Sequence, residues 1–133
     1  MTRSGLIKCA VAVTGKFQPS VDCASGQVGA ALVTRDGNVY TGVCIGTASS
    51  IGFCAEHAAI AEMLKHHESE IAMVVAVDTE GRVLPPCGRC RELIHQVNRA
   101  NLNTVVIISP KKTMSLGDLL PHRWQDAWGQ GKA

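Results

Sequence analysis

The sequence has few aromatic residues and no long apolar run. Its 133 residues include two Trp, one Tyr and two Phe, so the bases of a nucleic acid would find few rings on which to stack. No apolar stretch approaches the roughly 18 residues that a membrane-spanning helix needs, and the apolar part of the N-terminus is too short for a typical signal peptide. We therefore expect a cytoplasmic protein that binds neither membranes nor nucleic acid.

A strong charge of either sign is also missing. Thirteen basic and eleven acidic side chains leave a net charge of +2, whereas a duplex-binding domain usually carries a dense basic patch. The sequence has no internal repeat, low-complexity tract or linker, and a chain of 133 residues suits one domain. We therefore predict a single domain over residues 1–133.

The apolar segments predict an α/β fold. The expected strands are residues 28–34, 39–45, 71–78 and 104–109, the first two joined by a hairpin turn at Asp36-Gly37. The expected helices are residues 5–16, 54–67 and 87–99, with a short one in 115–120, while 17–27 and 79–83 look rich in turns. A hairpin followed by alternating helices and strands indicates a mixed sheet between helical layers.

Six cysteines in a chain of this kind indicate thiols that bind metal or react, because disulfides are rare in the cytoplasm. Cys9, Cys23 and Cys44 are scattered among apolar neighbours, and we interpret them as buried or bystander thiols. The other three lie in two short motifs, "CAEH" and "PPCGRCREL".

These motifs predict a metal site. Cys87 and Cys90 have the spacing of neighbours on one helix face, and Cys54 begins a different helix. The free N–H groups at a helix N-terminus stabilise thiolates, and thiolates suit zinc. A structural zinc normally has four protein ligands, whereas three leave a position for water, as in catalytic sites. We predict one zinc per chain.

Glu56 lies two residues after Cys54, so it cannot easily point in the same direction as the ligand. A carboxyl group beside the bound water would take its proton and pass it to a leaving group. We also expect His57, Arg89 or Arg91 near the site, because three thiolates on one zinc leave a net negative charge.

Other interpretations remain open. A glutamate in the first turn of a helix is often a surface residue placed there by the helix dipole. A C-x-x-C pair can be a redox dithiol, although redox chemistry has no use for Cys54 or Glu56. A zinc-binding protein without catalytic activity would leave Glu56 unexplained.

The two motifs resemble those of the zinc cytidine deaminase family, in which three cysteines hold zinc and a glutamate acts as acid and base on a cytosine ring. "VGAALVTRDGNVYTG" and "SLGDLLPHRW" are similar to the first hairpin and the closing segment of the family, so the resemblance covers residues 27–124. It implies a three-layer α/β/α sandwich around a mixed five-stranded sheet, with the fifth strand near 111–114.

The resemblance also assigns roles. It implies that Cys54, Cys87 and Cys90 bind zinc, that Glu56 shuttles the proton and that the backbone N–H of Ala55 contacts the pyrimidine carbonyl. It further implies a homotetramer acting on a free nucleoside. Family members that act on nucleic acid commonly begin the first motif with His-x-Glu instead.

Three positions depart from the family pattern. Ordinary members present Asn-x-Glu to the ribose hydroxyls, where this chain has Cys44 and Gly46, and they have an aromatic residue in place of Gln27. His57 stands where Arg is common. Blasticidin S deaminases share this profile, so a modified nucleoside such as blasticidin S is one expected substrate, and cytidine or deoxycytidine is the alternative. A side chain at Gly46 would be tolerated only if its φ angle is not positive.

Overall fold

The structure is a computed structural model, and it describes residues 1–128. Its helices are α1 (Arg3–Val13), α2 (Ala55–Lys65), α3 (Gly88–Val97) and α4 (Leu116–Leu119), with 3-10 turns η1 (Arg99–Asn103) and η2 (Trp124–Ala127). Its strands are β1 (Phe17–Ser20), β2 (Cys23–Thr34), β3 (Val39–Thr47), β4 (Ile71–Asp78), β5 (Val83–Leu84), β6 (Val105–Ser109) and β7 (Lys112–Ser115). None of the described helices is long and apolar enough to cross a membrane.

The predicted mixed sheet is confirmed, but it has seven strands and not the expected five. The five expected strands lie in the order β3-β2-β4-β6-β7, with β1 also paired to β2 and β5 also paired to β4, and only the β4–β6 pair is parallel. A parallel pair needs a long crossover connection, which α3 provides between β4 and β6. The fifth strand, Lys112–Ser115, lies where the resemblance placed it.

Two short strands contradict the sequence prediction. Residues 17–27 were expected to be turns, but they form β1 and the first part of β2, which pairs with the end of β3 through Cys23–Thr47 and Ser25–Ile45. Val83 and Leu84, expected in and beside a turn, pair with β4. In both cases a neighbouring strand supplies hydrogen-bond partners that local composition does not reveal.

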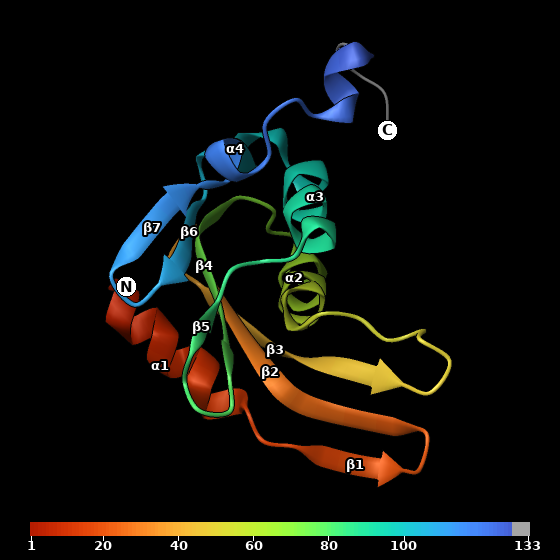
Figure 1. The fold of residues 1–133 in the computed structure, drawn as a ribbon. Coiled ribbons are helices and arrows are strands. Elements are labelled where there is room, and N and C mark those ends of the chain that lie inside the picture. Colours follow the sequence, from red (N-terminus) through yellow and green to blue (C-terminus); the bar gives the residue numbers. More distant parts are fainter. Residues whose placement is uncertain (129–133) are drawn as a thin grey trace.

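Helices cover both faces of the sheet, with α1 on one side and α2 and α3 on the other (Figure 1). Side chains of one strand alternate between the two cores: Val74 packs with α2, while Val75 packs with α1. The apolar character of β4 therefore comes from burial on both faces, as the unbroken run of apolar residues in its sequence predicted. This arrangement is the predicted three-layer α/β/α sandwich.

Gly42 sets the position of α2 on the sheet. A Cβ atom at this residue would lie 2.5 Å from the Ala58 Cβ and 2.5 Å from the backbone nitrogen of Ala59, well inside van der Waals contact. The absent side chain lets the helix lie directly on β3. The N-terminus of α2, which carries Cys54 and Glu56, is fixed by this contact.

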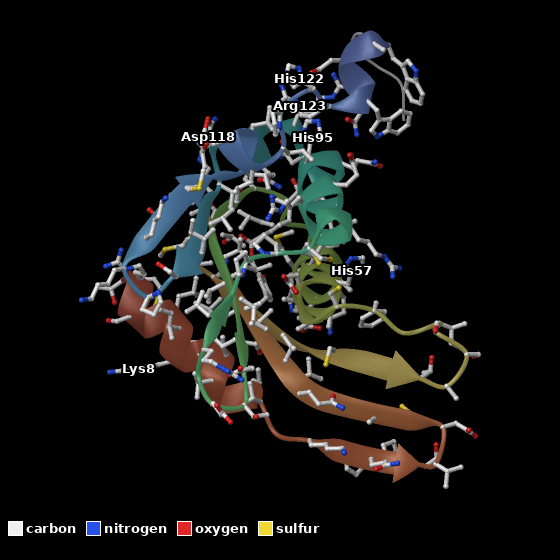
Figure 2. All side chains as sticks on the ribbon, in the orientation of Figure 1. Lys8, His57, His95, Asp118, His122 and Arg123 are labelled. Atoms are coloured by element: carbon white, nitrogen blue, oxygen red, sulfur yellow. The ribbon has the colours of Figure 1, made fainter. Side chains whose placement is uncertain are left out.

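The C-terminal segment docks on α3 near His95. Gln125 donates from Nε2 to the Glu92 carboxylate at 2.5 Å, and Figure 2 shows His95, His122 and Arg123 gathered where the segment meets α3. His95 is only 3% exposed, and its Nδ1 has no hydrogen-bond partner among residues 1–128. A protonated His95 would therefore be poorly solvated.

The His95 environment predicts a loss of stability in acid. Burial lowers the pKa of His95, and the nearby Arg123 lowers it further. In the unfolded chain the His95 side chain binds a proton near pH 6.5, whereas in the folded chain it binds that proton only at a lower pH. The free energy of unfolding should therefore fall as the pH drops below about 6.5. Urea unfolding measured at about pH 8 and about pH 5.5 gives the change in the free energy of unfolding between the two pH values. This change should be smaller for His95→Asn than for the wild type. Equal differences would contradict the prediction.

Candidate active site

Two helix N-termini meet at the three motif cysteines. Cys54 is the N-cap residue of α2 and Cys87 is the N-cap residue of α3, both with extended backbone and neither using its side chain as a cap. Cys90 lies in the first turn of α3 and is buried. Both thiol-bearing helix ends were predicted from the sequence, because each motif lies at the start of an expected helix.

The sulfur atoms form a compact triangle. The distance from Cys54 Sγ to Cys87 Sγ is 3.4 Å, that from Cys87 Sγ to Cys90 Sγ is 3.6 Å, and all three sulfurs lie within 4.8 Å of one another. A tetrahedral ion with bonds of about 2.3 Å to sulfur separates its ligands by about 3.8 Å. The cluster therefore fits one zinc, as the motif spacing predicted.

Backbone donors favour a thiolate at the N-terminus of α3. Although burial acts in the opposite direction, the N–H groups of Cys90 and Arg89 hold the pKa of Cys87 below its usual value. Burial raises the pKa of Cys54 and Cys90, and the Glu56 carboxylate adds to this effect. A cation bound between the sulfurs would offset that cost.

Glu56 lies in the first turn of α2 and is only 5% exposed, which contradicts the alternative of a surface residue. Burial raises the pKa of its carboxyl group. Both Glu56 and two of the cysteines, Cys54 and Cys87, line the same pocket. The carboxyl group therefore faces the space that a small ligand would occupy.

This pocket has a volume of about 270 Å³ and is mostly apolar. Its lining residues are Val28, Cys44, Phe53, Cys54, Ala55, Glu56, Ala76, Leu84, Pro85 and Cys87. The polar groups gather at the sulfur cluster and Glu56, so the reactive end of a ligand would lie there and the rest against apolar side chains.

The proposed sugar-facing residues lie in different places. Cys44 lines the pocket, and its thiol accepts from the Val28 N–H at 3.4 Å and donates to Gln27 Oε1 at 3.5 Å. Gly46 is exposed and does not belong to the lining. Its φ angle is not positive, and a Cβ atom there would meet only the Ala24 carbonyl oxygen, at 3.6 Å.

Three basic residues were expected around the site. The His57 ring stacks on Phe53 with centroids 6.0 Å apart, its Nε2 has no partner among the described residues, and burial lowers its pKa. Arg89 reaches the Gly52 carbonyl at 3.5 Å and so links α3 to the loop that precedes α2. Arg91 instead donates to two backbone carbonyls, those of Pro86 at 2.8 Å and Leu119 at 3.1 Å.

Several lining residues were not predicted from the sequence. Phe53 is held beside the pocket by a two-way backbone pairing with Ile45, at 3.0 Å in each direction. Leu84 belongs to β5, the strand that composition did not predict. The one signal available was adjacency, because Phe53 directly precedes Cys54 and Leu84 directly precedes the Pro-Pro pair of the second motif.

Comparison with known proteins agrees with this geometry. Residues 2–108 match the model of the cytidine and deoxycytidylate deaminase zinc-binding region. The chain is 36% identical over 103 residues to a cytidine deaminase of Mycobacterium tuberculosis (strain ATCC 25618 / H37Rv), covering 77% of this chain and 72% of that protein. It is 30% identical over 125 residues to a cytidine deaminase of Halalkalibacterium halodurans, covering 91% and 92% respectively.

Solved structures show the same fold. A crystal structure of cytidine deaminase from Mycobacterium tuberculosis matches with a TM-score of 0.78 at 28% identity, covering 93% of this chain and 98% of that one. A crystal structure of cytidine deaminase from Burkholderia pseudomallei matches with a TM-score of 0.73 at 33% identity, covering 92% and 98%.

Proposed function

Because the chain belongs to the cytidine and deoxycytidylate deaminase zinc-binding family, whose members are zinc-dependent hydrolases, we propose that it deaminates the cytosine ring of a free nucleoside or nucleoside analogue. In this reaction water replaces the exocyclic amino group and ammonia leaves. The observation that carries the proposal is the buried Glu56 carboxyl facing the same pocket as the sulfur cluster.

Each site residue has a part in this reaction. Cys54, Cys87 and Cys90 would hold zinc, which when bound lowers the pKa of a water molecule to about 7. Glu56 takes the two protons of the attacking water in turn and delivers one to the ring nitrogen and the other to the amino group, which leaves as ammonia. The Ala55 N–H, at the start of α2, has no partner within the helix, and we propose that it donates to the pyrimidine carbonyl.

The substrate we favour has a sugar that is changed relative to ribose, as in blasticidin S. The Cys44 thiol is already engaged with Val28 and Gln27, and Gly46 offers no side chain. A site built to bond hydroxyl groups discriminates strongly in their favour, whereas an apolar site does not. The pocket lining around Cys44 is apolar, so it should discriminate little in favour of ribose hydroxyl groups.

Cytidine is the second candidate. The relatives named above are called cytidine deaminases, and one of them aligns over 91% of this chain. Six free cysteines fit a reducing compartment, so we place either reaction in the cytoplasm.

An ammonia-release assay would test the proposal. The purified zinc-loaded protein would be given cytosine, cytidine, deoxycytidine and blasticidin S. Release from at least one of them supports deamination, and their relative efficiencies rank the candidates. Release from none would refute it. Zinc analysis combined with thiol titration would identify a redox dithiol, because metal-bound thiolates react only after the metal is chelated.

The double change Cys44→Asn/Gly46→Glu should shift preference towards cytidine. Asn and Glu restore acceptors for ribose hydroxyl groups, and the backbone at Gly46 leaves room for a side chain. We expect the ratio of kcat/KM for cytidine to that for a sugar-changed analogue to rise by about tenfold or more. The thermal unfolding temperature of the variant should be checked alongside. A wild-type kcat/KM for cytidine near 10⁶ M⁻¹s⁻¹, as an order of magnitude for good enzymes, would contradict the proposal of a changed sugar site.

We also propose a homotetramer. The β1–β2–β3 extension and the loop after β3 carry exposed apolar side chains, with Phe17 65%, Val21 91% and Ile51 79% exposed. Trp124 and Trp128, each about half exposed, pack edge to face in the C-terminal segment. Exposed apolar groups of this kind mark protein interfaces. Light scattering should give about four times the chain mass of 14.1 kDa. A monomeric mass would contradict the tetramer.

A further inference from the structure

Phe53 is the only aromatic residue among the described residues that line the pocket. It is partly exposed, and the proposed reaction gives it no part. Away from the sulfur cluster and Glu56, the rest of the lining consists of smaller side chains, those of Val28, Cys44, Ala76, Leu84 and Pro85. Phe53 therefore offers a ligand the largest apolar side chain in this pocket.

The backbone holds Phe53 at a fixed place. Its N–H donates to the Ile45 carbonyl and its carbonyl accepts from the Ile45 N–H, both at 3.0 Å. The preceding Gly52 lies so close to β3 that a Cβ atom there would stand 1.8 Å from the Ile45 carbonyl oxygen. Ile45 directly follows Cys44, and Phe53 directly precedes Cys54. Phe53 is therefore a neighbour of both Cys44 and the sulfur cluster.

The Phe53 ring also packs against a second ring. The His57 imidazole stacks on it, with centroids 6.0 Å apart and 12° between the two planes. His57 lies in the first part of α2, so a regular helix supports the stacked pair. A side chain that is already held by its backbone and by a neighbouring ring loses little freedom when a ligand packs on it, and this preorganisation favours binding.

The reaction decides which part of a substrate would meet Phe53. The ring carbon C4, which bears the amino group, must lie at the sulfur cluster and Glu56, because water attacks there. N1 is opposite C4 on a pyrimidine ring, so its substituent points away from the cluster and towards the apolar part of the pocket. The volume of about 270 Å³ exceeds that of a bare cytosine ring and leaves space for such a substituent.

We infer that Phe53 is a specificity-determining residue that packs against the N1 substituent of the substrate. The inference rests on the proposed deamination and narrows its substrate class to cytosines whose N1 carries a ring with an apolar face. Apolar surface gains from contact with a phenyl ring, whereas a hydroxyl group pressed against that ring loses its hydrogen bonds to water. A cyclic group without hydroxyls should therefore bind better than ribose.

Three model substrates test the inference in the zinc-loaded full chain. They share the cytosine ring and differ at N1: 1-methylcytosine has a minimal substituent, 1-cyclopentylcytosine has a five-membered ring without hydroxyl groups, and cytidine has a five-membered ring with them. We expect kcat/KM for 1-cyclopentylcytosine to exceed that for 1-methylcytosine by about tenfold or more, mainly through a lower KM, and to exceed that for cytidine. If it does not exceed both, the inference is wrong.

Substitutions at Phe53 link the ratio of the cyclopentyl to the methyl substrate to its side chain. Phe53→Ala removes the ring and should bring the ratio of the two kcat/KM values close to one. Phe53→Leu keeps a smaller apolar side chain, so its ratio should lie between those of the wild type and Phe53→Ala. Since both substrates undergo the same reaction, a general disturbance of the site would lower both rates and leave the ratio unchanged.

Leu64→Ala is the matched control. Leu64 lies on α2, is 44% exposed and does not belong to the pocket lining, so its loss should leave the ratio as it is in the wild type. Thermal unfolding and zinc content would show that each variant is folded. If Phe53→Ala does not fold, Phe53→Leu decides, and a wild-type ratio in that variant would refute the inference.

The outcomes distinguish this inference from the proposed function. If ammonia is released but Phe53→Ala keeps the wild-type ratio, deamination stands and the role of Phe53 is wrong. If none of these substrates and none of those in the broader screen releases ammonia, the proposed function fails, and the inference fails with it.

Discussion

The Glu56→Gln variant should lose turnover by a factor of about one hundred or more while keeping its fold and its zinc. Glutamine has the size of glutamate but cannot accept and return a proton. Glu56 is buried in the first turn of α2 and faces the pocket, so the change removes the proposed acid–base group without filling or emptying space. Initial rates of ammonia release at saturating substrate, with zinc measured on the same sample, would test this expectation.

Glu62→Gln provides the matched control. Glu62 lies on the same helix, but its side chain is 44% exposed and forms a salt bridge with Lys65 at 3.1 Å. Exposed pairs of this type contribute little to stability, and the residue is outside the pocket lining. Its turnover should therefore match the wild type. A Glu56→Gln protein as active as Glu62→Gln would show that the buried carboxyl takes no part in proton transfer.

Local signals account for what the sequence predicted well. The strand expected at residues 71–78 is β4, with the same limits, because burial on both faces gives a continuous apolar run that turns bound on each side. The sulfur cluster was likewise predictable. Each cysteine of the cluster either precedes a helix as its N-cap or lies in the first turn of that helix. The spacing of the cysteines within the motifs therefore predicts their positions without knowledge of distant partners.

Features that depend on distant partners were not predictable. The first part of β2 is a strand because the end of β3 pairs with it, and β5 is a strand because β4 does. Arg91 was one of three basic residues expected near the zinc site, and its contacts with the Pro86 and Leu119 carbonyls were not foreseen. Nothing in "CREL" specifies a carbonyl 28 residues further along the chain. The pairing of Gln27 with Cys44, 17 residues apart, has the same origin, since only the strand register brings them together.

Removing any one of the three sulfur ligands should abolish stoichiometric zinc binding. Cys54→Ala, Cys87→Ala and Cys90→Ala each leave two thiolates where the cluster has three, and two protein ligands rarely hold zinc against chelation. Zinc analysis after dialysis should give about one ion per chain for the wild type and close to none for each variant. Cys9→Ser and Cys23→Ser should retain zinc, because neither residue belongs to the cluster.

The same variants should also be less stable, because the sulfur ligands come from the starts of two helices and the ion would join them. Cys54 and Cys87 are 33 residues apart, so a shared ion ties α2 to α3. Zinc present at a hundred times its Kd would stabilise the fold by about 2.7 kcal/mol, which corresponds to a fall in Tm on the order of ten degrees when it is lost. Chelation should therefore lower the Tm of the wild type to that of Cys54→Ala and leave Cys54→Ala itself unchanged. A full complement of zinc in any of the three alanine variants would mean that the cluster is not the metal site.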